Sequence, residues 1–332
     1  MIFSKFFLFL SAAFCIIFSI SSCSNEFELT EGDVDIPIVY GVISTTDTAT
    51  YIRVERAFIS EETSAYVLSK DPDQLYYKDI TVKLKHVKSG KEFTLYRVDG
   101  NLEGYQRSPG AFADAPNYLY KIKKSELNLI PKDDYTLIVS HNDGQVLTEA
   151  TTTVIAPYQN ADITNPGPTA LLSLINNSDF KIRWFGDPNA VIHDIQLVIN
   201  FKEEKGGNLE DKSVVWTIVK NHDKNEYSLK GRLFYEFLQG ALDKDPLKKR
   251  YFQHASLIVV SGGQAIKDYI SIGQANLGIT SSGEIPVYSN LSKDGQGIFS
   301  SKTSFIRTDI GLAQGTLDSL RGSVLTKSLN FQ

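Results

Sequence analysis

Cysteine is almost absent from this chain of 332 residues. Its two cysteines, Cys15 and Cys23, both lie near the N-terminus, so the rest of the chain has none. This distribution excludes disulfide bonds, cysteine-ligated zinc and a thiol nucleophile from the folded body. The body must therefore depend on its hydrophobic core, and 42% hydrophobic residues are enough to form one.

An excess of basic charge is also missing. The formal net charge is -5, and no stripe of Lys and Arg runs along any segment. Because a protein that binds nucleic acid needs a basic face to neutralise phosphates, we expect no nucleic-acid partner.

Catalytic and metal-binding motifs are absent as well. No G-x-S-x-G nucleophile motif occurs, and the Asp-x-Asp pairs do not lie in EF-hand loops. The five histidines show no H-x-H or H-E-x-x-H spacing. The sequence therefore predicts a protein without a metal or cofactor that is not an enzyme. A glycosidase remains the open exception, because its paired carboxylates have no local motif.

The N-terminus carries the clearest signal in the sequence. Lys5 precedes an apolar run from Phe6 to Ile20, which has the length of a signal-peptide core and is too short for a typical membrane span. Ile20-Ser21-Ser22-Cys23 then resembles a lipobox, with a branched aliphatic residue followed by two small ones. We expect residues 1–22 to be a lipoprotein signal peptide and Cys23 to carry the lipid that binds the protein to a membrane.

An acidic segment follows the cysteine. Residues 23–36 contain five acidic residues and no basic one, which favours a solvated tether.

From Ile38 onward, short apolar runs alternate with turn signals, which is typical of a β-sandwich. Hairpin turns are predicted at residues 88–91 and 142–144. Expected strands cover residues 38–44, 50–58, 79–87, 92–98, 134–141 and 145–155. A segment rich in Pro and Gly after Ala156-Pro157 marks a boundary. We therefore expect a mainly β protein, with an immunoglobulin-like sandwich at 37–157 and a second β-rich domain at 158–332.

The second half adds one or two short helices to this expectation. Apolar residues at helical spacing predict a helix near residues 233–242 and another near 268–277. Trp184 alternates with polar neighbours and is expected in the core of a fibronectin-like sheet. The polar stretch from Glu203 to Lys212 is expected to be a loop. The aromatic residues expected to be exposed near loops are Tyr76, Tyr77, Tyr105, Tyr118 and Tyr120. Because tyrosine is common both in recognition surfaces and in ordinary strands, a binding role for them is the less favoured interpretation.

Three stretches resemble a family of lipoproteins from the Bacteroidota, the domain of unknown function 4249. They are IPIVYGVISTTDTATYIRVERAF at the start of the body, DDYTLIVSHNDGQVLTEATTTVIAP at the end of the first domain, and IPVYSNLSKDGQGIFSSKTS near the C-terminus. The resemblance implies an immunoglobulin-like domain followed by a β-rich one, often encoded near TonB-dependent outer-membrane receptors. It carries no established catalytic residues. The acidic tether is similar to a loose surface-export signal of this phylum.

The resemblance also implies two candidate modification sites. Asp47-Thr48-Ala49 and Asp318-Ser319-Leu320 look like the Asp-Ser/Thr-apolar sequences at which Bacteroidota O-glycosylate exported proteins.

We expect an interaction or ligand-capture lipoprotein, anchored in the outer membrane on its periplasmic face or at the cell surface, that acts beside a β-barrel receptor. The alternative is a carbohydrate-binding or carbohydrate-active protein of a polysaccharide system. Paired carboxylates in a cleft with exposed Tyr or Trp would favour the alternative, and a cleft-free double sandwich would favour the first.

Overall fold

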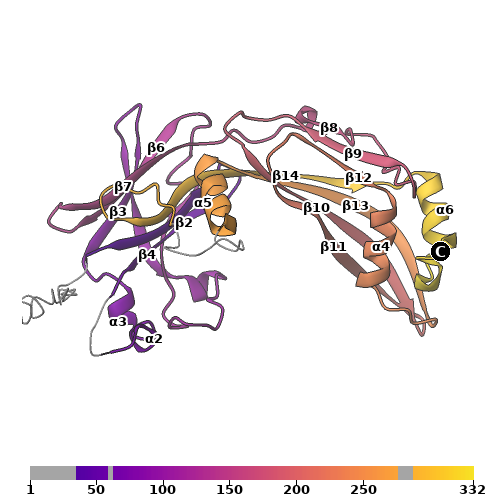
Figure 1. Ribbon diagram of the computed structural model, residues 1–332, viewed down its shortest axis with the longest axis horizontal. Helices are drawn as coiled ribbons and strands as arrows, with labels where there is room; N and C mark the ends of the chain where they lie inside the picture. Colours follow the sequence, from indigo (N-terminus) through magenta and orange to yellow (C-terminus); the bar gives the residue numbers. More distant parts are fainter. Residues whose placement is uncertain (1–34, 59–62, 276–286) are drawn as a thin grey trace, which may run out of the picture.

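The computed structural model describes residues 35–58, 63–275 and 287–332. Within these ranges the chain forms two β-sandwiches side by side in an arch, joined across its top by the long strand β14 (Gln296–Ile310) (Figure 1). No helix in the described ranges is long and apolar enough to cross a membrane.

The first sandwich consists of two facing sheets. The first sheet has the order β1-β2-β5 and the second has the order β4-β3-β6-β7. The strands are β1 (Pro37–Ile43), β2 (Ala49–Arg56), β3 (Ile80–His86), β4 (Glu92–Asp99), β5 (Tyr118–Lys123), β6 (Asp134–His141) and β7 (Val146–Thr153). Strand β4 pairs with β3 through its first half and with β5 through its second half, so it passes from one sheet to the other. This order is that of an immunoglobulin-like sandwich.

Alternation of apolar and polar residues explains why these segments form half-buried strands. In β6, Tyr135, Leu137 and Val139 point inward and are fully buried, while the residues between them are partly exposed. The backbone N–H of Ile130 donates a hydrogen bond of 3.2 Å to the hydroxyl of Tyr135. A tyrosine at the start of this strand that bonds the backbone a few residues upstream is a hallmark of immunoglobulin-like domains.

The second sandwich repeats the same strand order. Its small sheet has the order β8-β9-β12, and its large sheet has the order β11-β10-β13-β14. Apart from β14, the strands are β8 (Ile163–Asn165), β9 (Asp179–Trp184), β10 (Ile192–Lys205), β11 (Asn208–His222), β12 (Glu226–Lys230) and β13 (Lys248–Gly262). Trp184 is fully buried between the sheets, as the sequence predicted. The predicted fold class, mainly β with an immunoglobulin-like first sandwich, is confirmed.

Helices occupy the connections between strands. They are α2 (Ala65–Leu68), α3 (Pro72–Leu75), α4 (Arg232–Ala241), α5 (Gln264–Ala275) and α6 (Gln314–Gly322), with 3-10 turns at Gly100–Glu103, Asn160–Asp162 and Lys327–Leu329. Helices α4 and α5 lie where apolar spacing predicted helices. Helix α6 was not predicted, because a stretch of nine residues with two leucines and a glycine near each end gives a weak helical pattern.

Strand β14 belongs to both sandwiches. Its first half pairs in parallel with β1, and its second half pairs antiparallel with β13. Phe299 from β14 is fully buried in the core of the first sandwich. Two glycines allow β14 to lie close to β1. A Cβ on Gly41 would lie 3.0 Å from the Phe299 ring, and one on Gly297 would lie 2.1 Å from the carbonyl oxygen of Val39. The first core therefore includes side chains from beyond residue 290, whereas the second core extends from Tyr158 to Phe331.

One predicted loop is a hairpin instead. Strand β10 continues to Lys205 and β11 begins at Asn208, so the polar stretch 203–212 is paired strand with a tight turn. Gly206 and Gly207 form the turn with φ angles of 59° and 85°, in the left-handed region that glycine tolerates. The loop prediction was wrong because charged residues here are stabilised within paired strands. The Glu203 carboxylate lies 3.0 Å from Lys248 and 2.9 Å from Arg250, both on the neighbouring strand β13.

Candidate binding cleft

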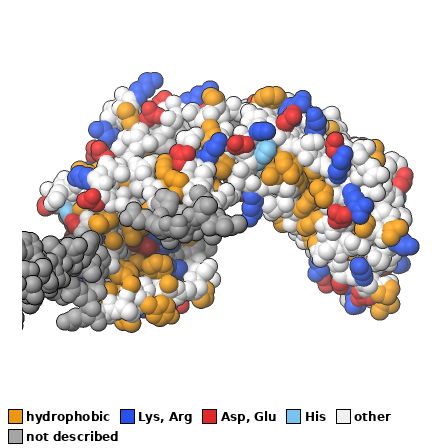
Figure 2. All heavy atoms as spheres, in the orientation of Figure 1, with side chains coloured by type: hydrophobic (Ala, Val, Ile, Leu, Met, Phe, Trp, Pro, Cys, Tyr) orange, Lys and Arg blue, Asp and Glu red, His pale blue; other side chains and the backbone are white. Residues whose placement is uncertain are grey.

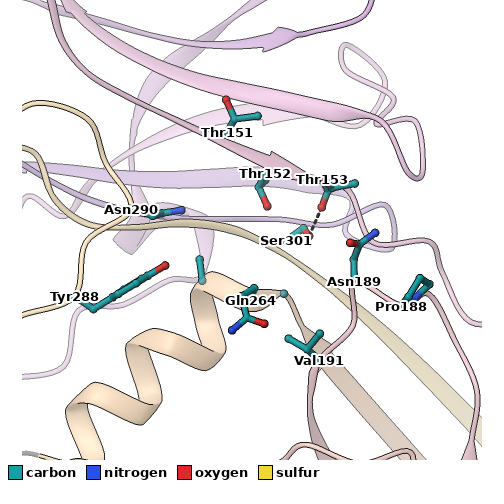
Figure 3. A pocket seen from close by; sticks show the side chains of 12 residues that line it. Thr151, Thr152, Thr153, Pro188, Asn189, Val191, Gln264, Tyr288, Asn290 and Ser301 are labelled. Carbon is teal, nitrogen blue, oxygen red and sulfur yellow. Dashed lines mark hydrogen bonds between the residues drawn. The ribbon is translucent and has the colours of Figure 1, made fainter.

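A polar cleft of about 380 Å³ lies where the two sandwiches meet. Its walls come from the end of β7, the segment before β10, the β13–α5 junction, the segment before β14, and β14 itself (Figure 3). Tyr288 and Asn290 lie on one side, and Pro188 and Asn189 lie on the other. The remaining lining residues are Thr151, Thr152, Thr153, Val191, Gly263, Gln264, Ala265 and Ser301.

Hydrogen bonds hold these walls in place. The Ser301 hydroxyl donates to the carbonyl oxygen of Thr153 at 2.6 Å, which ties β14 to β7. The N–H of Gly263 donates to the carbonyl oxygen of Ser301 at 3.0 Å, which sets the start of α5 against β14. The side-chain amide of Asn290 bonds both the N–H and the carbonyl oxygen of Phe299, at 2.9 and 2.8 Å. Both sandwiches therefore contribute fixed walls to one cleft.

The lining is neutral. Hydroxyl and amide groups dominate it, and none of the lining residues within the described ranges is charged. The nearby carboxylates are engaged in the local structure: Asp187 accepts the N–H of Ala156 at 2.9 Å, and Asp268 accepts the amide of Gln264 at 2.7 Å. Burial raises the pKa of Tyr288, and Asp268 beside it adds to the rise, so the phenol stays protonated at neutral pH. The described lining can donate and accept hydrogen bonds but includes no carboxylate pair for acid–base chemistry.

A buried polar group near the cleft resembles part of a catalytic site but is closed to substrate. The Oγ of Ser261 lies 2.7 Å from Nδ1 of His193 and 2.8 Å from the hydroxyl of Tyr158. Ser261 and His193 are only 1% and 2% exposed. Burial lowers the pKa of His193 to about 4, so the imidazole is neutral at neutral pH. This group ties β10 to β13 and to the linker before β8, and we assign it a structural role.

The predicted modification sites differ in their surroundings. Cys23, the signal peptide and the tether up to residue 34 lie outside the described residues. Thr48 is exposed in the turn between β1 and β2. Ser319 lies half-buried on α6, where its hydroxyl donates to the carbonyl oxygen of Gly315 at 2.8 Å.

The aromatic residues predicted to be exposed near loops are mostly interior. Tyr76, Tyr77 and Tyr120 are buried, and of the five only Tyr105 is strongly exposed. The prediction was wrong for these three because residues near a loop can still turn into the sandwich. The sequence reading missed Tyr288 and Gln264, which neither periodicity nor spacing distinguishes. No group of three or more metal-ligating side chains occurs in the described part of the chain.

Comparisons with known proteins give only structural matches with low scores. No protein-family model matches the chain, and no curated protein does. A structure titled as a cytokine receptor complex shares 11% identity, with a TM-score of 0.24, over 83% of this chain and 97% of that chain. The chicken CNTN1 FN1-FN3 domains share 12% identity, with a TM-score of 0.18, over 68% and 59%. The chicken interferon gamma receptor alpha chain shares 10% identity, with a TM-score of 0.18, over 70% and 90%. Such low TM-scores carry no functional argument.

Proposed function

We propose that this protein is a non-enzymatic capture lipoprotein of the bacterial outer membrane, anchored through Cys23 and acting beside a β-barrel receptor of the TonB-dependent type. The observation that carries the proposal is the neutral, hydroxyl- and amide-lined cleft between the two sandwiches. Binding sites are typically concave and largely preformed, with a few polar groups that fix the orientation of the ligand.

The structure meets only part of each sequence criterion, because the double sandwich has a cleft with a tyrosine and its described lining has no carboxylate pair. The missing carboxylates support capture over catalysis. Hydrolysis of a glycoside needs two carboxylates that flank the reacting bond, and the lining residues that the structure describes include no Asp or Glu. The nearby Ser261 and His193 are buried behind the cleft wall and cannot meet a substrate. The described lining can therefore recognise a ligand through its hydroxyl and amide groups and through the ring of Tyr288.

The fixed walls support the same proposal. Because β14 pairs with strands of both sandwiches, the two sides of the cleft are held by one continuous strand. A preorganised site loses less conformational entropy when a ligand binds than a site that must first order itself.

Tyr288 favours a second candidate function, which is carbohydrate binding in a polysaccharide system. An aromatic ring next to amide and hydroxyl groups matches the two needs of a neutral sugar, a flat apolar surface and partners for its hydroxyls. Tyr288 stands on one side of the cleft with Asn290, and Gln264 lies on the helix α5 below it (Figure 3).

The test is ligand binding by the full-length lipidated protein in detergent. Neutral oligosaccharides and short uncharged peptides are titrated against wild type, Tyr288→Ala and the control Tyr96→Ala, which removes an exposed tyrosine from β4. We expect Tyr288→Ala to weaken binding at least about tenfold, the equivalent of 1.4 kcal/mol, and the control to bind as wild type does. Binding of an oligosaccharide would support the carbohydrate-binding candidate. Binding of a peptide would support capture of a peptide ligand instead. Hydrolysis of any glycan by the purified protein would contradict both.

A further inference from the structure

One end of the first sandwich carries the N-terminal entry of the described chain. Strand β1 begins there, and Pro37 pairs with Arg56 at the end of β2. Ile80 at the start of β3 pairs with His141 at the end of β6 at this same end. The Nε2 of His141 lies 2.8 Å from a carboxylate oxygen of Asp35, which fixes the entering chain at this position. We call this region the N-terminal loop end, and it comprises Asp35, residues 63–79, residues 100–117 and the 142–145 turn.

Large apolar side chains are exposed on the N-terminal loop end. Figure 2 shows hydrophobic side chains gathered on the lower part of the first sandwich, the part that carries α2 and α3 in Figure 1. Leu102 is 88% exposed and Val67 is 57% exposed. The other exposed members are Tyr66, Tyr105 and Phe112. These side chains come from two different connections, so chance exposure of a single loop tip does not explain them.

Hydrogen bonds join the two connections into one surface. The Ser69 hydroxyl donates to the carbonyl oxygen of Ala111 at 2.6 Å, and the N–H of Ala113 donates back to the carbonyl oxygen of Ser69 at 2.9 Å. The Nζ of Lys70 donates to the carbonyl oxygen of Phe112 at 3.0 Å. The surface is therefore a defined part of the fold.

Two cations lie against the aromatic rings of this surface. The Arg107 guanidinium lies 4.7 Å from the centre of the Phe112 ring, and the Lys70 ammonium lies 5.9 Å from the centre of the Tyr66 ring. Aromatic rings with adjacent Lys or Arg are typical of protein parts at the membrane interface, where the rings sit at headgroup depth and the cations meet phosphates. The Arg107 side chain is only 13% exposed and pairs with Glu55 at 2.9 Å, so of these two cations the exposed Lys70 is the one that can meet phosphates.

The length of the preceding chain brings this end to a membrane. Cys23 precedes Asp35 by 35 − 23 = 12 residues, so a lipid on Cys23 holds the loop end within roughly 40 Å of the bilayer even if the tether is fully extended. At such a distance, weak apolar contacts gain from a high effective concentration.

We propose that the N-terminal loop end lies against the lipid bilayer, with Tyr66, Val67, Leu102, Tyr105 and Phe112 in the interface and Lys70 at the phosphates. The proposal rests on the lipid anchor of the proposed function. It also orients the cleft, because the eight residues of β7 lead away from this end to Thr153, about 25 Å distant at strand spacing. The cleft then lies well clear of the lipid.

The cysteine-free body permits a direct test. Val67→Cys and the matched control Val87→Cys are made in the full-length protein and labelled with an environment-sensitive fluorophore. Val87 is 48% exposed at the opposite end of the same sandwich, just after β3. The labelled proteins are reconstituted in vesicles of phosphatidylethanolamine and phosphatidylglycerol, with and without a doxyl-labelled lipid that quenches fluorophores in the bilayer.

We expect the Val67 label to shift to the blue and to be quenched several-fold more than the Val87 label. Equal, weak quenching of both labels in protein that floats with the vesicles would overturn the bilayer contact while leaving the anchor intact. A blue shift without quenching, seen only after a β-barrel receptor is added, would overturn it in favour of a protein partner. A protein that does not float, and whose Cys23 also takes the fluorophore, would instead show that the lipid anchor itself has failed.

Discussion

Replacement of Phe299 by alanine tests whether the two sandwiches are stable as one unit. Phe299 comes from β14, late in the chain, yet its ring is fully buried in the core of the first sandwich. Truncation of a buried phenylalanine to alanine costs about 3–5 kcal/mol, through lost apolar contact and the cavity left behind. We expect a loss in this range, because the ring packs tightly over Gly41, where a Cβ would lie 3.0 Å from it.

The two tryptophans make the assay informative. Trp184 and Trp216 both lie in the second sandwich, so their fluorescence follows that sandwich alone, while far-UV circular dichroism follows both. Because β14 pairs with β1 and with β13, unfolding of the first sandwich releases the strand that borders the second. In urea, Phe299→Ala should therefore shift the fluorescence and dichroism midpoints together.

The control is Phe185→Ala, which removes an exposed ring and should change the free energy of unfolding by less than about 0.5 kcal/mol. A Phe299→Ala protein whose tryptophan transition keeps the wild-type midpoint, while the dichroism splits into two steps, would refute the shared-strand coupling.

Three further predictions concern pH, anchoring and modification. Burial lowers the pKa of His193 to about 4, so between that pH and the ordinary value near 6.5 the unfolded chain binds a proton that the folded chain does not. The free energy of unfolding should therefore fall by roughly 3 kcal/mol as the pH drops through this window, and His193→Gln should flatten the slope; identical slopes in the two proteins would be evidence against the assignment. Metabolic labelling with an alkynyl fatty acid should mark wild type and not Cys23→Ala, and equal labelling would exclude Cys23 as the anchor. Intact-mass measurement of native protein should show sugar that Thr48→Ala lacks, because Thr48 is exposed in a turn; a mass of peptide and acyl chains alone would rule out this modification.

Strand alternation and turn chemistry made the fold predictable from sequence. Residues 134–141, predicted as a strand, form β6 with the same bounds, because Tyr135, Leu137 and Val139 alternate with polar residues and the Asn-Asp-Gly turn follows. The role of β14 could not be predicted in this way. A strand shared by two sandwiches has no distinctive local sequence pattern, because its pairing with β1 joins residues more than 250 positions apart.

The cleft was beyond sequence reasoning for a related reason. Thr151, Tyr288 and Gln264 come from three distant segments, and each residue type is common on strands, loops and helix starts. Local patterns identify chemistry only where spacing along the chain encodes geometry, as in metal-binding motifs. The prediction of exposed aromatic residues failed because a position near a loop does not fix where a side chain points. Tyr76 and Tyr77 follow a short helix and are buried in the core.

The central claim, capture beside a membrane receptor, is tested most directly by gentle cross-linking in native envelopes followed by purification through this protein. The account predicts recovery of one outer-membrane β-barrel receptor in near-stoichiometric amount from wild type, and its loss from Cys23→Ala, which is no longer held at the membrane. Recovery of no barrel from wild type, together with hydrolysis of a glycan by the purified protein, would contradict it.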